Sequence, residues 1–186
     1  MIKASNKKSV LVVIASTAGV LLLLAAGVYL YFYFQFCTYQ DDLYKFSIKY
    51  PRNWTVDAHP KKNVAVVFLR PKDTVLDTVQ ENFNVTVQPM PNDIYSLDAF
   101  TATIKRQMIG VFGKSINIIE DKPIQWGWHD GHILVIDAPT PDHLKLVVAW
   151  VLKDNQSYIL TFLGDMNKYQ HDSILVNEMI RSLILQ

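Results

Sequence analysis

The sequence has a single cysteine, Cys37, and it lacks any long tract of glycine and serine, of proline or of charge of one sign. One cysteine cannot form a disulfide within the chain, so packing must hold the core together. The chain carries 18 basic and 17 acidic residues, and three of the lysines precede a long apolar run, which leaves 15 basic residues against 17 acidic ones. A surface that binds a phosphate backbone needs clustered Lys and Arg. Nucleic acid is therefore not expected as a partner.

The sequence also lacks the short motifs of the common enzyme classes. It has no Gly-x-Ser-x-Gly elbow, no glycine-rich phosphate loop and no His-Glu-x-x-His pair. Its one cysteine lies next to the apolar run. These absences predict a protein that is not an enzyme and has neither a catalytic residue nor a cofactor. A divergent enzyme without a recognisable motif is the remaining alternative.

The long apolar run extends from Val10 to Phe36 and contains no charged residue. About 20 apolar residues at roughly 1.5 Å each span a bilayer, so this run is long enough for a transmembrane helix. Lys3, Lys7 and Lys8 precede it, and this positive charge predicts a cytoplasmic N-terminus with the rest of the chain across the membrane. The expected location is the bacterial inner membrane, with the domain facing the periplasm.

Aromatic residues crowd the outer end of the run, among them Tyr29, Tyr31 and Tyr33, and such rings favour the boundary between lipid and water. A cleaved signal peptide normally has a shorter apolar stretch of about 7 to 15 residues. Cleavage at Ala25-Ala26-Gly27 is the alternative. Lipidation of Cys37 is not expected, because the residues before it are not the small ones that lipoprotein processing requires.

These features divide the chain into four parts: a cytoplasmic N-terminus at 1–9, a transmembrane helix at 10–36, a juxtamembrane linker at 37–43 and an extracytoplasmic domain at 44–186. A domain of this size forms one ordinary globular unit with one core.

The domain shows both strand and helix patterns. Alternation of apolar and polar residues, with proline and glycine at the ends, predicts strands over 46–50, 63–69, 82–88 and 116–122. Ser96 is a good N-cap, and apolar residues recur at helical spacing from Leu97 to Val111. We therefore expect a helix there, ended by Gly113.

Two further hairpins follow in the sequence. Asp130-Gly131 is a strong two-residue turn signal, and Asp154-Asn155 is a weaker one. The segments 144–153 and 157–163 are apolar at consecutive positions, so both faces of these strands must be covered. Helical spacing from Ile174 to Leu183 supplies a second helical layer. The pattern predicts an α+β domain of the α/β/α sandwich type.

One motif opens the domain: Tyr44-x-Phe46-Ser47-Ile48-Lys49-Tyr50-Pro51-x-x-Trp54. Later segments follow in order: Phe83-Asn84-Val85-Thr86-Val87, Ser96-Leu97, Tyr158-Ile159-Leu160-Thr161-Phe162 and Met179-Ile180-Arg181-Ser182-Leu183. Together they resemble the PsbP-like and DcrB-like superfamily over residues 41–186. The resemblance implies a central, mainly antiparallel sheet between helices, in proteins that act as accessory or binding subunits.

Relatives in this superfamily include photosynthetic proteins, bacterial envelope proteins and eukaryotic proteins that bind a nuclear transport GTPase, and the predicted anchor excludes the last role. We expect a non-enzymatic single-pass membrane protein. Its partners would be the lipid bilayer and other protein subunits of a membrane or envelope complex. A module that binds a small ligand or a metal ion at the membrane surface is the alternative.

Two histidines are candidate metal ligands. His129 and His132 flank the predicted Asp130-Gly131 turn, where facing residues have Cβ atoms about 5 Å apart. Zinc normally takes three or four protein ligands, so Asp130 or His143 would have to complete the set. Two solvated histidines beside a turn are the alternative.

Two tryptophans are candidate partner-binding residues. Trp126 and Trp128 are two positions apart in a predicted strand, with Gly127 between them, so they point to the same side. Tryptophan is enriched at interface hot spots, and the pair could form an exposed platform. Burial in the core is the alternative, because most tryptophans in a domain of this size are largely buried.

Overall fold

The computed structural model describes residues 17, 19–27, 35–74, 79–90, 96–113, 116–138, 140 and 143–186. The chain forms two compact units, Met1–Cys37 and Thr38–Gln186. In the first unit, residues 17 and 19–27 are helical, and the large apolar residues from Val20 to Leu24 are 57 to 76% exposed. Within the described ranges, no helix is both long and apolar enough to cross a membrane. The predicted anchor start and interface tyrosines lie outside the described residues: Val10, Tyr29, Tyr31 and Tyr33.

The residues of the predicted juxtamembrane linker, 37–43, form most of a strand and the turn after it. Strand β1 (Phe36–Asp41) begins at the last residue of the predicted span, and strand β2 (Phe46–Pro51) follows it. Between them the Asp41 Oδ1 accepts hydrogen bonds from the backbone N–H groups of Leu43 and Tyr44, at 3.0 and 2.8 Å. Aromatic residues such as Tyr39 favour strands, and its ring packs on Phe68 with centroids 5.9 Å apart. Strand β1 therefore includes the last residue of the predicted span.

The second unit is built on a seven-stranded sheet in the order β3-β4-β5-β9-β8-β7-β6. Its strands are β3 (Thr55–Lys61), β4 (Val64–Leu69), β5 (Asn82–Pro89), β6 (Asn117–Trp126), β7 (His129–Ala138), β8 (Leu144–Lys153) and β9 (Gln156–Asp165). A three-stranded sheet has the order β1-β2-β10, where β10 (Ile184–Leu185) pairs with β2. All neighbours in the large sheet are antiparallel, which confirms the predicted sheet type.

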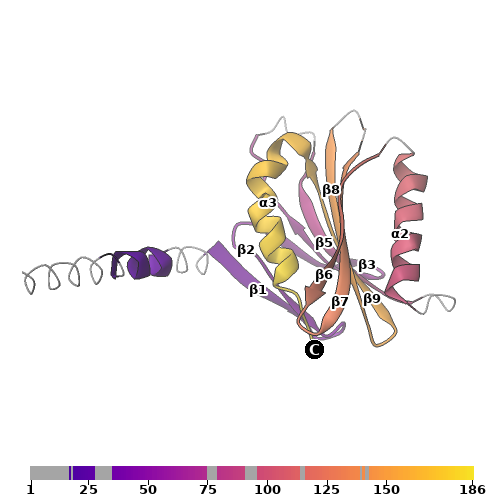
Figure 1. Cartoon of the computed structure of the whole chain (residues 1–186), viewed down its shortest axis with the longest axis horizontal. Helices are drawn as coiled ribbons and strands as arrows, with labels where there is room; N and C mark the ends of the chain where they lie inside the picture. Colours follow the sequence, from indigo (N-terminus) through magenta and orange to yellow (C-terminus); the bar gives the residue numbers. More distant parts are fainter. Residues whose placement is uncertain are drawn as a thin grey trace, which may run out of the picture. The chain divides into compact units, whose positions relative to one another are not determined.

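Helix α2 (Leu97–Phe112) covers one face of the large sheet, and helix α3 (Met166–Arg181) lies on the other side (Figure 1). Helix α2 begins where predicted, because the Ser96 hydroxyl accepts a hydrogen bond from the Ala99 N–H at 3.1 Å. It ends at Gly113, whose φ of 79° suits glycine. The local cap residues therefore define this helix.

Helix α3 starts at Met166, well before the apolar pattern that begins at Ile174. Asp165 caps its first turn, where the carboxylate accepts a hydrogen bond from the Asn167 N–H at 2.8 Å. The helix lies against β2, β8 and β9. The predicted α/β/α sandwich is confirmed, with the small sheet on the α3 side as an addition that the sequence patterns did not reveal.

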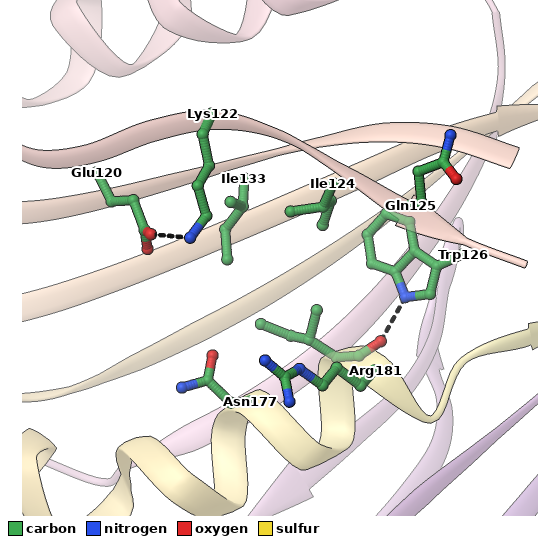
Figure 2. A pocket seen from close by; sticks show the side chains of 9 residues that line it. Glu120, Lys122, Ile124, Gln125, Trp126, Ile133, Asn177 and Arg181 are labelled. Atoms are coloured by element: carbon green, nitrogen blue, oxygen red, sulfur yellow. Dashed lines mark hydrogen bonds and ion pairs between the residues drawn. The ribbon is translucent and has the colours of Figure 1, made fainter.

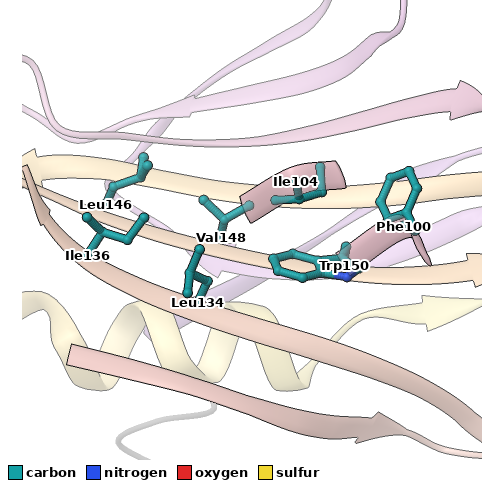
Figure 3. Packing of buried hydrophobic residues seen from close by; sticks show 7 residues of the cluster. All are labelled: Phe100, Ile104, Leu134, Ile136, Leu146, Val148 and Trp150. Atoms are coloured by element: carbon teal, nitrogen blue, oxygen red, sulfur yellow. The ribbon is translucent and has the colours of Figure 1, made fainter. Parts of the chain in front are cut away.

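The core under α2 is a continuous apolar cluster (Figure 3). It contains Phe100 and Ile104 from the helix, and Leu134, Ile136, Leu146, Val148 and Trp150 from β7 and β8. Trp150 is fully buried, and its indole N–H donates to the Thr101 hydroxyl at 3.1 Å. Residues at the intervening positions of β8, such as Val147, point to the other face and are buried as well, as the consecutive apolar pattern predicted.

The turn between β6 and β7 lies at Gly127-Trp128, so the predicted turn at Asp130-Gly131 is wrong. His129 pairs with Trp126 directly across the two-residue turn. Gly127 takes a φ of 57°, which a glycine adopts without strain in such a turn. The other predicted turn, Asp154-Asn155, is confirmed between β8 and β9, with φ values of 51° and 60°.

Gly131 is a packing glycine. A Cβ atom at this position would lie 2.5 Å from the Trp126 ring and 2.6 Å from the backbone oxygen of Trp150. The missing side chain lets the Trp126 ring lie directly against β7. What resembled a turn signal in the sequence is therefore a requirement of tertiary packing.

Candidate functional site

A cleft of about 250 Å³ opens between strand β6 and helix α3 (Figure 2). Strand β6 is an edge strand of the large sheet and pairs there with β7. Residues at alternate positions of β6 point toward α3, and residues in the last turns of α3 face them from the other side. The cleft therefore joins a sheet edge to the C-terminal end of a helix.

The floor of the cleft is apolar, formed by Ile124, Trp126, Ile133 and Ile180. Trp126 is only 5% exposed, and its indole N–H donates a hydrogen bond to the backbone oxygen of Ile180. The last carbonyl groups of a helix lack the usual partners within the helix, and this bond gives the Ile180 oxygen a donor besides the Leu183 N–H at 3.4 Å. It also fixes the end of α3 against the edge strand.

The rim of the cleft is polar. Glu120 and Lys122 form an ion pair along β6. Asn177 and Arg181 lie four residues apart on α3 and therefore project from the same side of the helix, toward the strand (Figure 2). The Arg181 guanidinium forms no ion pair or hydrogen bond with any other residue that the structure describes. Two cations and one carboxylate leave the rim with one net positive charge.

A second and more open hollow of about 380 Å³ lies where the turns after β6 and β8 approach the start of α2. Met90, Leu97 and Leu152 give it apolar surface, and His129 lies at its border. Trp128 also lines it, yet this residue is 99% exposed. A side chain that buries almost nothing contributes almost nothing to folding.

The structure places the two predicted tryptophans in different surroundings. Trp126 is buried in the floor of the β6–α3 cleft, whereas Trp128 lies in the turn and is exposed. The expected exposed platform of two neighbouring rings is therefore not formed, because a turn begins directly after Trp126. A role for Trp128 in partner binding stays a prediction.

The two predicted metal ligands are not brought together. His129 and His132 both lie in β7, three residues apart, and so point to opposite faces of the sheet. His132 stacks on Trp150 with centroids 5.1 Å apart, and its Nε2 lies 2.6 Å from the Asp121 Oδ1. In the described ranges, no three His, Cys, Asp or Glu residues form a group that could hold a metal ion. Metal binding stays a prediction, but the two histidines do not face each other as that prediction assumed.

Asp121 connects the edge strand to α2. The Lys105 ammonium lies 2.5 Å from its Oδ2, and His132 contacts its other oxygen. The hydrogen bond from Lys105, aided by that from His132, holds the pKa of the Asp121 carboxyl below its usual value. This cluster ties β6, β7 and α2 together on the side of the sheet opposite the cleft.

Sequence reasoning missed a cluster of buried charges around Arg70. The Glu81 and Asp172 side chains are each 1% exposed, and Arg70 approaches both, with Nη1 3.6 Å from Glu81 Oε2 and Nε 3.4 Å from Asp172 Oδ2. All four carboxylate oxygens lack a hydrogen-bond partner among the described residues. Burial raises the pKa of Asp172, with Glu81 adding to the rise and Arg70 opposing it. Nothing in the local sequence distinguishes these residues from exposed ones.

No protein-family model matches the chain, and no curated protein was found to match its sequence. Solved structures do match. The PsbP protein of the cyanobacterium Synechocystis (CyanoP) has a TM-score of 0.62 at 12% identity and covers 82% of this chain and 93% of its own. The Ran-binding protein Mog1p of Saccharomyces cerevisiae has a TM-score of 0.57 at 7% identity, with coverages of 81% and 95%.

A third match is LpqN of Mycobacterium tuberculosis, described as involved in cell envelope biogenesis, with a TM-score of 0.56 at 8% identity and coverages of 76% and 83%. At such low identities these matches show the fold and nothing finer. The described domain therefore has the PsbP-like fold, as the sequence resemblance implied.

Proposed function

We propose that the protein is a non-enzymatic binding or accessory subunit of a membrane or envelope complex. In this proposal the N-terminal apolar run anchors it, with the N-terminus in the cytoplasm and the PsbP-like domain across the membrane. The observation that carries the proposal is the β6–α3 cleft, which has an apolar floor and a charged rim and lies at one edge of the large sheet.

The cleft has the composition of a recognition surface. Protein interfaces combine an apolar centre with a polar rim. Ile124 and Ile133 supply such a centre here, and Lys122 and Arg181 lie on the rim. Mog1p, which is named as a Ran-binding protein, supports a binding role, and LpqN, which is described as involved in cell envelope biogenesis, supports a role at the envelope.

The anchor is supported by the sequence and by the exposed helical segment. Val20 and the four leucines after it expose 57 to 76% of their area, and apolar area in water is unfavourable by about 25 cal/mol per Å². Strand β1 begins at Phe36, so the membrane segment must end before it. Val10 to Phe34 still exceeds the roughly 20 residues that a span requires.

The test compares the full chain with a chain that begins at Gln35, which keeps β1 intact. Both are purified from detergent extracts under crosslinking conditions. We expect the full chain to resist alkaline extraction from membranes and to retain one defined partner, and the shorter chain to leave the membrane fraction.

A matched pair of variants locates the contact. Ile124→Glu places a charge in the cleft floor and should abolish capture of the partner, whereas Val111→Glu alters a residue on α2 that is already 70% exposed and should leave capture unchanged. Circular dichroism checks the fold of both. Absence of a stable partner for either chain, or equal capture by both variants, would overturn the proposal.

A further inference from the structure

The unpaired arginine of the β6–α3 cleft indicates what kind of group the cleft receives. Glu120 is neutralised by Lys122, so Arg181 supplies the remaining charge, and no other acidic side chain lines the cleft. A guanidinium presents its donors in a planar fork that matches a carboxylate with two parallel hydrogen bonds. The rim therefore favours a carboxylate over a neutral or cationic group.

Asn177 strengthens this preference. It lies one helical turn before Arg181 and lines the same cleft (Figure 2), and its amide group has two N–H donors that can reach a ligand there. The Trp126 N–H is already committed to the Ile180 carbonyl. Lys122 is paired with Glu120, and Gln125 donates to Asp130, so the donors without a partner in the described part of the chain lie at the helix side of the rim.

The size of the cleft limits the ligand to a small group. Its volume of about 250 Å³ lies below the roughly 300 to 1,000 Å³ of pockets that hold drug-sized ligands. One carboxylate and one adjacent aliphatic side chain would fill it. The aliphatic group would cover Ile124 and Ile133, which form the floor beside the rim.

The edge strand itself is unsuited to pairing with another strand. Pro123 lies in the middle of β6 and offers no N–H, and the register with β7 shifts between Ile118 and Glu120. Prolines and bulges on edge strands block the addition of a further strand. A peptide ligand would therefore be held through the peptide's own side chains and not by pairing with β6 as an added strand.

We propose that the β6–α3 cleft binds an acidic peptide segment of a protein partner, with a carboxylate on Arg181 and Asn177 and a neighbouring aliphatic side chain on the floor. This inference rests on the proposed function and names the chemistry of the partner. Charge complementarity with the unpaired Arg181 is the reason for choosing an acidic segment.

The experiment measures peptide binding to the detergent-solubilised full chain by fluorescence anisotropy. The probes are labelled acetyl-Val-Leu-Asp-Val-Leu-amide, the same peptide with Asn in place of Asp, and free valerate as an unlabelled competitor. We expect the Asp peptide to bind about tenfold more tightly than the Asn peptide, the factor that one charge-assisted bond supplies. Valerate should compete only weakly.

Variants connect this preference to the cleft. Arg181→Met should remove the preference for Asp, and Arg181→Lys should restore only part of it because lysine lacks the fork. Arg106→Met is the matched control, since Arg106 is an exposed arginine on α2, on the opposite side of the sheet. Circular dichroism shows whether each variant is folded.

Three outcomes would overturn the inference: equal binding of the two peptides, a preference that survives Arg181→Met, or valerate binding as tightly as the peptide, which would indicate a small-molecule carboxylate site. A different result would overturn the proposed function. A partner that is captured by the full chain regardless of Arg181 would end the inference and leave the function standing, whereas failure to capture any partner would end the function.

Discussion

The two faces of the seven-stranded sheet are built differently. The α2 face is covered by one apolar cluster, and its one buried polar side chain in the helix, Thr101, accepts a hydrogen bond from Trp150. The α3 side buries the charged side chains of Glu81, Lys145 and Asp172 and carries the β6–α3 cleft. The same strands contribute to both faces, because successive residues point in opposite directions.

This difference separates two tasks. A face whose buried groups are nearly all apolar can pack densely. A face that buries charges carries a desolvation cost, which well-placed opposite charges offset only in part. We therefore assign stability mainly to the α2 face and, in the function proposed above, recognition to the α3 face.

The strongest way to break this assignment is to remove the largest side chain from the α2 core. Trp150→Ala should lower the free energy of unfolding by about 4 kcal/mol, because it leaves a cavity in a fully buried cluster. Urea denaturation followed by circular dichroism measures the loss. Trp128→Ala is the control, and it should change stability by less than about 0.5 kcal/mol, since Trp128 is 99% exposed.

A smaller effect is expected where Trp126 meets β7. Gly131→Ala should lower the free energy of unfolding by about 2 kcal/mol, because the new methyl group would lie 2.5 Å from the Trp126 ring. Gly110→Ala on α2 is the matched control, with nothing within 4 Å of the added Cβ, and it should be neutral or slightly stabilising. A neutral result for Gly131→Ala in the same denaturation experiment would contradict the close packing of Trp126.

The buried carboxylate of Asp172 sharpens the comparison through its pH dependence. Its raised pKa means that the folded chain keeps a proton where the unfolded chain, with the ordinary value of 3.8, has lost it. The contribution of Asp172 to stability is therefore fully present below that value and is lost as the pH rises through the folded pKa. Asp172→Asn should remove this loss and raise stability near neutral pH by about 1 kcal/mol.

The readout for Asp172→Asn is the difference in unfolding free energy between variant and wild type from pH 3 to pH 8. It should be near zero in acid and should grow as the pH rises. A variant that is less stable than the wild type at neutral pH would mean that the ion pair with Arg70 outweighs the cost of burial.

The smallest effect is expected for Asp121 on the α2 face, and it has the opposite sign. Its pKa is lowered by Lys105, so its contribution is present above its ordinary pKa of 3.8 and is lost as the pH falls through the folded value. Asp121→Asn should cost less than about 1 kcal/mol at neutral pH, because the group is partly exposed. Salt should reduce that cost, and the same pH series should show it vanishing in acid.

Local signals in the sequence predicted those parts of the fold that local interactions determine. The Ser96 cap and Gly113 define α2, and Asp154-Asn155 defines the turn between β8 and β9, because these residues act on their own neighbours. Asp130-Gly131 failed as a turn signal. Gly131 is needed for the approach of Trp126, a tertiary contact that the pattern of residues does not contain.

The candidate site could not be predicted from the sequence for the same reason. The cleft joins residues of β6 to Asn177 and Arg181, which are far apart along the chain and meet only after the sheet has formed. Glu81 and Asp172 likewise resemble ordinary exposed acids until the structure places them around Arg70. Of the sequence signals that reach beyond local structure, only the resemblance to the PsbP-like superfamily was correct, and it predicted the fold but not the site.

The most direct test of the account is site-specific photocrosslinking in intact membranes, because it compares the two faces in a single protein. A photoreactive amino acid replaces either Asn177 at the cleft or Gln107, an exposed residue on α2. We predict a crosslink to one partner protein from position 177 and none from position 107. Crosslinks from position 107 alone, or the same products from both positions, would contradict the assignment of recognition to the α3 face.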